Sequence, residues 1–209
     1  MEYSLFFYAL LGFLGSFFGT IPFGPINLSV VDTTLKDGMR SAMIFALAAA
    51  IIEFLYSYLS LTCYWVLNEQ IEGNPYVPGI VAIVFIFGGI FFFLKRSKGK
   101  GEQEEPKRSA SFVKGLVIST LNPQAVPYWI FVISFYKMQH YIDMSTTENI
   151  QLILSFVIGA AVGKVACLWA FAALSKRIAH RLTTISLYMN KIIGVVLIVI
   201  GLSQVIKVI

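Results

Sequence analysis

Six long runs of uncharged, mostly apolar residues constrain the fold of this chain more than any other feature of its sequence. About 20 apolar residues suffice for one transmembrane helix. Of the 209 residues, 57% are hydrophobic and 13% are charged, whereas a soluble domain has roughly 25% charged residues. Too few polar side chains exist to cover a soluble surface. The sequence therefore predicts an all-α integral membrane protein with six spans, and it excludes a cytosolic enzyme, a nucleic-acid-binding protein and a disordered chain.

The runs predict approximate bounds for the spans. The first run is too long for one straight helix, and Glu2 stands where a signal peptide would have basic residues, so we expect an uncleaved first span. The six predicted spans are residues 3–35, 41–66, 77–94, 112–137, 150–174 and 187–206.

Basic residues predict the orientation of these spans. The alternate connections, which follow spans one, three and five and extend into the starts of spans four and six, hold 13 of the 16 Lys and Arg residues. Because cytoplasmic loops are enriched in Lys and Arg, both termini should be non-cytoplasmic and the protein should be a multi-pass protein of the cell (inner) membrane. The run KRSKGK at residues 95–100 resembles a nucleic-acid patch, but the topology already requires its charge, so no nucleic-acid partner is expected.

The chain divides into two halves of three spans each. We expect a first repeat at residues 1–94, a basic cytoplasmic linker at 95–111 and a second repeat at 112–209. Because each half has three spans, spans one and four run in opposite directions. The predicted fold is therefore a 3+3 inverted-topology repeat.

Spans one and four are each interrupted by prolines. The first interruption reads IPFGPIN and the second LNPQAVP, and each contains an asparagine. Prolines remove backbone donors, and broken helices survive in a membrane only where they face protein or a water-filled cavity. Breaks at matching positions of two halves indicate the binding site of a transporter. The candidate residues at these breaks are Pro22, Gly24, Pro25, Asn27, Asn122, Pro123 and Gln124.

Two charged residues lie near the middle of equivalent spans. Glu53 is in span two and Lys164 is in span five. Charged groups at mid-membrane are costly and are functional candidates by default. They could form a structural ion pair, or they could bind the two ends of a zwitterion. Glu53 is also the candidate carrier of a coupling proton.

Three further features have simpler interpretations. Asp32 lies four residues before Lys36, which predicts a helical i,i+4 pair. The Gly15/Gly19 and Gly159/Gly163 pairs predict close helix packing.

Cys63 and Cys167 lie inside apolar runs without a CxxC motif, so we expect small core residues. The alternative, a thiol-based membrane oxidoreductase, stays open at this point. The sequence has no P-loop, no hydrolase motif and no metal-ligand spacing. We therefore expect no enzyme, no cofactor and no metal, and transport that uses an ion gradient or runs passively.

Two stretches resemble conserved blocks of the lysine exporter (LysE/RhtB) family. They are IPFGPINLSVVDTTLKDGMRSAMIFALAAAIIE and KGLVISTLNPQAVPYWIFVISFY. The first is similar to the family's PGP element, basic inner loop and acid in span two, and the second to its Asn-Pro-Lys element with a following aromatic residue. Membership would imply export of amino acids or related small metabolites, by proton or cation antiport. The positions that match are Gly24, Pro25, Glu53, Asn122 and Pro123.

The sequence also departs from the family pattern near the breaks. Phe23 replaces the first proline of PGP and Gln124 replaces the lysine of Asn-Pro-Lys. Ala46, Ala49 and Ala50 stand where the family favours glycine, and Glu53 where it favours Asp. These departures bear on the identity of the substrate.

Together these observations predict a secondary exporter with a site between the two broken spans. The substrate's amino group would meet Glu53, and its carboxylate would meet Lys164 or the free backbone amides of a half-helix. Asn27 and Asn122 would orient it. Expected partners are an amino-acid-like substrate, the lipid bilayer and a proton, with homo-oligomerisation left open. Export of an inorganic cation or metal on the same fold is the alternative, and a non-transporting scaffold is a further one.

Overall fold

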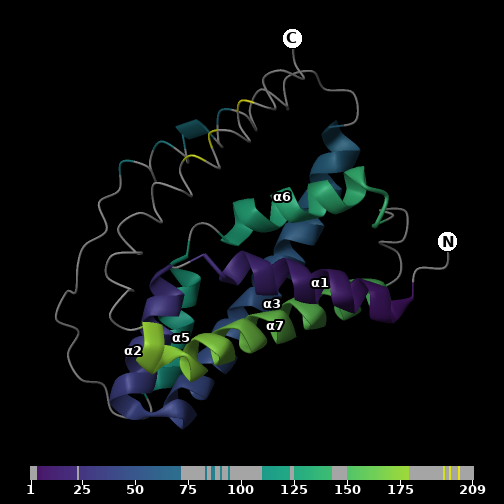
Figure 1. The fold of residues 1–209 in the computed structure, drawn as a ribbon. Coiled ribbons are helices and arrows are strands. Elements are labelled where there is room, and N and C mark those ends of the chain that lie inside the picture. The colour runs from purple at the N-terminus through teal and green to yellow at the C-terminus, as the bar shows by residue number, and fades with distance from the viewer. Residues whose placement is uncertain are drawn as a thin grey trace. The chain divides into compact units, whose positions relative to one another are not determined.

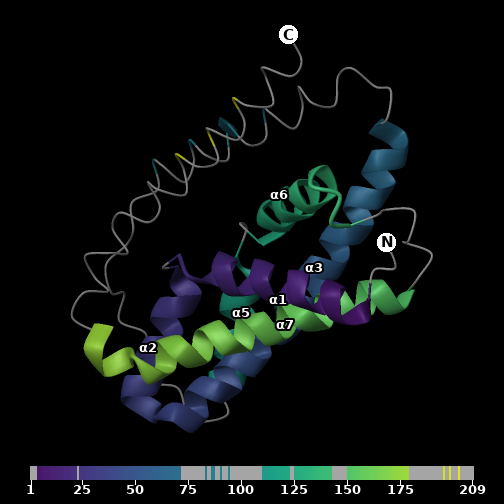
Figure 2. The ribbon, with the colours of Figure 1, turned by 45° about the vertical axis from the view of Figure 1, so that its right-hand side comes forward.

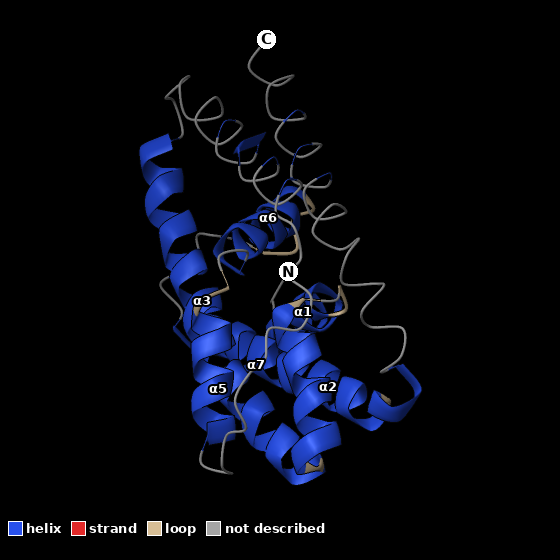
Figure 3. Ribbon diagram, turned by 90° about the vertical axis from the view of Figure 1, so that its left-hand side faces the viewer, coloured by secondary structure: helices blue, strands red, loops and turns tan. Residues whose placement is uncertain are grey.

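The structure is a computed structural model, which describes residues 4–22, 24–71, 110–122, 125–142 and 150–178 and a few isolated helical positions. Predicted spans three (77–94) and six (187–206) and most of the linker at 95–111 lie outside the described residues. The described elements are all helices (Figure 3). They are α1 (Leu5–Thr20), α2 (Pro25–Asp37), α3 (Met39–Ile71), α5 (Ala110–Thr120), α6 (Ala125–Met138) and α7 (Ile150–Ala173).

Among the described residues, two helical segments are long and apolar enough to cross a membrane. They are Met39–Tyr64 within α3, and α7. If each bent pair, α1 with α2 and α5 with α6, counts as one span, the number rises to four. Large apolar side chains at a spacing of four residues are exposed along α7, namely Leu154, Ile158 and Val162. An exposed apolar stripe of this kind suits a helix that faces lipid. The structure is that of an all-helical membrane protein.

The first predicted break is confirmed between α1 and α2. The two helices meet at 78°. Pro25 is the first residue of α2, and Gly24 before it has an extended backbone. Proline suits this position because the first amides of a helix have no intrahelical acceptor. At its other end α2 stops at Gly38, whose φ of 85° favours glycine.

The second predicted break is confirmed between α5 and α6. These helices meet at 64°. α5 begins at Ala110, two residues before the predicted start of span four, and α6 begins at Ala125. Pro127 therefore lies in the first turn of α6, where the ring of proline is tolerated.

The described helices belong to one compact unit, which combines Met1–Val66 with Glu105–Ala179 and so includes α3 only as far as Val66. This unit draws on both predicted repeats, and the division of the chain into repeats stays a prediction. Within the unit α1 lies along α7 (Figures 1 and 2).

Glycines allow the close approach of α1 and α7. A Cβ atom at Gly159 would overlap the carbonyl of Ala9, and one at Gly163 the carbonyl of Phe13. Gly12, on α1, lies equally close to the carbonyl of Phe156. The packing role predicted for Gly159 and Gly163 is thus confirmed, and Gly12 joins them.

The core of the unit is rich in aromatic side chains from α6. The Trp129 ring lies edge to face on Phe156 of α7, with centroids 5.5 Å apart. The Tyr136 ring also lies edge to face with Phe156, with ring centroids 6.5 Å apart. Tyr128, Trp129, Tyr136 and Phe156 thus form an aromatic layer. Gly15 and Gly19, predicted as a packing pair, face this layer: Gly15 lies against Trp129 and Gly19 against Tyr128. The layer fixes α6 against α1 and α7.

Candidate functional site

Glu53 and Lys164 form a buried ion pair. The Lys164 Nζ atom lies 3.1 Å from Glu53 Oε2, and the two side chains are 7% and 8% exposed respectively. Glu53 projects from α3 and Lys164 from α7. The two mid-membrane charges predicted from the sequence are thus brought together. A buried charge needs such a partner, because an unpaired one costs several kcal/mol.

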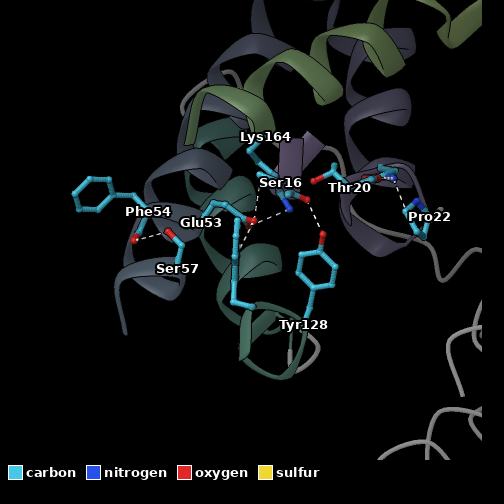
Figure 4. Close-up of polar contacts among 11 residues, drawn as sticks. Ser16, Thr20, Pro22, Glu53, Phe54, Ser57, Tyr128 and Lys164 are labelled. Carbon is cyan, nitrogen blue, oxygen red and sulfur yellow. Dashed lines mark hydrogen bonds and ion pairs between the residues drawn. The ribbon is translucent and has the colours of Figure 1, made fainter. Parts of the chain in front are cut away.

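The other carboxylate oxygen of Glu53 accepts two neutral hydrogen bonds. Ser16 Oγ donates to Oε1 at 3.2 Å, and Trp129 Nε1 donates to the same atom at 3.1 Å. Ser16 is on α1, shortly before the first break, and Trp129 is on α6, shortly after the second. Figure 4 shows Ser16 and Lys164 converging on Glu53. The carboxylate is therefore bonded to both bent helix pairs and to α7.

Small residues precede Glu53 on the same face of α3. Ala46, Ala49 and Ala50 lie seven, four and three residues before it, and all three are buried. Positions at this spacing share one face of a helix. The three alanines thus lie on the face of α3 that carries Glu53.

The Asn27 side chain donates hydrogen bonds to the backbone at the first break. Its Nδ2 atom donates to the carbonyls of Thr20, at 2.6 Å, and Pro22, at 3.0 Å. Thr20 is the last residue of α1, whose final carbonyls have no intrahelical donor. The side chain predicted to orient a substrate therefore also satisfies the backbone of the break.

A side chain of α3 donates a hydrogen bond to the backbone at the second break. Tyr56 Oη donates to the carbonyl of Thr120, the last residue of α5, at 2.7 Å. The backbone carbonyl of Asn122 accepts from the amide of Ala125, at 3.4 Å. Thr20 and Thr120 thus occupy corresponding places before the two breaks, and each receives a side-chain donor. Pro123 and Gln124 lie outside the described residues.

Two tyrosines of α6 donate hydrogen bonds to the backbone of α1. Tyr128 Oη lies 2.5 Å from the carbonyl of Gly15, and Tyr136 Oη lies 3.0 Å from that of Leu11. Sequence reasoning did not single out Tyr128, Trp129 or Tyr136. The available signal was their polar atoms, because a buried Tyr or Trp in a span normally finds an acceptor.

Asp32 makes the predicted contact and one more. Its Oδ2 atom lies 3.4 Å from Nζ of Lys36, as expected for an i,i+4 pair, and 3.7 Å from Nζ of Lys114. Lys114 is on α5. The second contact therefore joins α2, after the first break, to α5, before the second.

The cysteines are free, and Cys167 is buried while Cys63 is partly exposed. In the part of the chain that the structure describes, no three His, Cys, Asp or Glu residues are grouped to hold a metal ion.

Comparison with known proteins adds a family and one distant relative. Residues 17–207 match the family described as LysE type translocator. The "Putative amino acid efflux protein YcgF" of Bacillus subtilis (strain 168) is 25% identical over 122 residues, which cover 52% of this chain and 54% of that protein. The chain thus spans about half the length of this curated relative. No solved structure matches the chain significantly.

The family match covers most of the chain, including both breaks and both members of the ion pair. It agrees with the helical membrane structure and with the resemblance seen in the two proline-containing blocks. It also decides against the thiol oxidoreductase. The chain is a multi-pass membrane protein, and it belongs to the LysE type translocator family, whose members are described as translocators rather than enzymes.

Proposed function

We propose that this protein exports amino acids or closely related metabolites by alternating access, with the Glu53–Lys164 pair as its binding site. The observation that supports this most is the 3.1 Å ion pair, because its carboxylate is bonded to both bent helix pairs. The name of the Bacillus subtilis relative agrees with an amino acid as the exported compound.

The pair offers one group for each end of an amino acid. The substrate's ammonium would replace Lys164 at Oε2 of Glu53, and its carboxylate would take the ammonium of Lys164. The first turns of α2 and α6 add backbone amides with no intrahelical acceptor. Among the described residues, no atom lies within 4 Å of a Cβ atom placed at Gly24. Asn27 and Asn122 would orient the substrate from the two breaks.

The proposed fold around this site is a six-span, 3+3 inverted repeat. Its support is the distribution of Lys and Arg, with both termini non-cytoplasmic and residues 95–111 cytoplasmic. Two bent helix pairs, one in each half, agree with two similar halves. Rocking of one half against the other would expose the pair first to one side of the membrane and then to the other.

We also propose that a proton is the coupling ion and that Glu53 binds it. A protonated Glu53 no longer attracts Lys164, so proton binding would release the pair. Substrate and proton would then use the same carboxylate in alternate steps, which is the requirement for antiport.

Counterflow in proteoliposomes tests the proposed function. Vesicles containing the purified full chain and loaded with unlabelled L-norleucine should accumulate labelled L-norleucine. Glu53→Gln should reduce this flux at least about 100-fold, because it removes the negative charge that attracts the ammonium group of Lys164 or of the substrate. Asp37→Asn, which neutralises an exposed acid at the end of α2, is the matched control and should retain the flux. Equal flux in Glu53→Gln and Asp37→Asn would refute the assignment of the site.

A further inference from the structure

We propose that the transported amino acid has no cationic side chain, and that Lys164 sets this specificity by neutralising Glu53. This inference rests on the proposed function, because it assumes that the ion pair is the substrate site. It concerns the class of amino acid, which the family and the relative leave open.

The charges of the buried site balance each other. Within the described residues, Glu53 and Lys164 are the buried charged side chains, and they are paired with each other. The site therefore has no net charge. A zwitterion exchanges one ammonium and one carboxylate with the pair and leaves this balance unchanged. A dibasic amino acid would add one positive charge without a partner.

The predicted spans provide no second unpaired acid for an additional substrate cation. Across the six predicted spans, the acidic residues are Glu53 and Asp32. Asp32 already lies between two lysine ammonium groups, at 3.4 and 3.7 Å, and its side chain is 37% exposed. A second substrate cation at mid-membrane would therefore remain uncompensated. The free-energy cost of an uncompensated charge at mid-membrane corresponds to a discrimination of about 100-fold.

Lys164 contacts one of the two carboxylate oxygens of Glu53. Ser16 and Trp129 both donate to Oε1, whereas Lys164 Nζ lies on Oε2. Oε2 is thus the oxygen at which one ammonium group can replace another. Lys164 Nζ lies where the substrate ammonium would lie. Without Lys164, Glu53 would be an unpaired anion that attracts any additional cation.

The experiment compares two substrates of the same shape. L-norleucine and L-lysine differ by the terminal ammonium of the side chain, so their counterflow isolates the effect of that charge. In proteoliposomes with the full chain, kcat/KM for L-norleucine should exceed that for L-lysine about 100-fold. Lys164→Gln should reduce this preference at least about tenfold, because the extra ammonium then finds an unpaired carboxylate. Lys164→Arg should keep the preference, and so should Lys176→Gln, which neutralises an exposed lysine after α7.

The controls separate folding, site and specificity. Breaking a buried pair from one side is strongly destabilising, whereas replacing both partners is often nearly neutral. If Lys164→Gln is unstable in detergent, the double variant Glu53→Gln/Lys164→Gln should recover stability. Its flux should be as low as that of Glu53→Gln, and the flux that remains should be similar for the two substrates.

Wild-type transport of L-lysine at least equal to that of L-norleucine would overturn the specificity while leaving the site intact, provided that Glu53→Gln abolishes both fluxes. An unchanged preference in a stable Lys164→Gln variant would also overturn it. Absence of flux for both substrates would refute the proposed function and this inference together.

Discussion

At the scale of single residues, the two oxygens of Glu53 have different partners. Oε1 accepts from two neutral donors, Ser16 and Trp129, and Oε2 contacts the Lys164 ammonium. Neutral donors on one oxygen hold the carboxylate in place, so the proposed exchange of ammonium groups would take place on the other oxygen. Trp129 is fully buried and sits in the aromatic layer, so its indole N–H has a fixed direction.

Trp129→Phe tests this positioning role. The substitution keeps an aromatic ring in the layer but removes the N–H donor. A hydrogen bond to a charged group contributes about 1.5–3 kcal/mol, so kcat/KM for L-norleucine should fall about 10- to 100-fold, with the protein still folded. Trp169→Phe is the matched control, because Trp169 is 55% exposed on α7. Equal kinetics of the two variants would contradict the role of Trp129.

At the scale of helices, the two bent pairs contact each other in two different ways. α1 and α6 are joined by hydrogen bonds from Tyr128 and Tyr136 to the α1 backbone. α2 and α5 are joined by the ion pair of Asp32 with Lys114, in which the Asp32 side chain is 37% exposed and the Lys114 side chain is 15% exposed. A partly exposed ion pair contributes less than a fully buried one and is screened by salt. We therefore expect the contact between α2 and α5 to open more easily than the contact between α1 and α6.

Cross-linking tests whether this contact opens during transport. In a Cys63→Ser/Cys167→Ser background, Asp32→Cys with Lys114→Cys should lose L-norleucine flux when a short bifunctional thiol reagent is added, and a cleavable reagent should restore it after reduction. Alternating access requires α2 and α5 to separate, so a tether holds one state. Each single cysteine variant with the same reagent is the control. Full flux through the tethered protein would show that these helices stay together.

The helices also show what could be predicted from the sequence. Proline and glycine act locally, so the breaks before Pro25 and Ala125 were predictable from their residues alone. Mid-membrane charges need partners, which made the Glu53–Lys164 pair predictable. The partners of Oε1 were not predictable, because α6 is apolar and aromatic on all sides, so periodicity does not reveal which aromatic faces the site. The contact of Asp32 with Lys114 depends on tertiary packing, which the local i,i+4 pattern does not contain.

At the scale of the whole molecule, alternating access by an inverted repeat requires that the two halves cross the membrane in opposite directions. The support for this topology is the excess of Lys and Arg in alternate connections, with 13 of the 16 on one side. The compact unit agrees with an interface between the halves, because it joins helices from both.

Cysteine labelling tests this topology. In the same cysteine-free background, Ser97→Cys in the linker should react with a membrane-impermeant maleimide only in inside-out vesicles. Ser145→Cys, between predicted spans four and five, should react only in right-side-out vesicles or intact cells. The same orientation for both positions would contradict the alternation of the predicted spans.

Binding of substrate at the Glu53–Lys164 pair can be measured directly through the fluorescence of Trp129. The chain has three tryptophans, so Trp65→Phe/Trp169→Phe leaves Trp129, whose N–H is bonded to Glu53. Titration with L-norleucine should change the Trp129 emission saturably, with a midpoint that matches the KM of counterflow, and Glu53→Gln should abolish the change. Saturable counterflow without any change in Trp129 emission, and with normal flux in Glu53→Gln, would contradict the account.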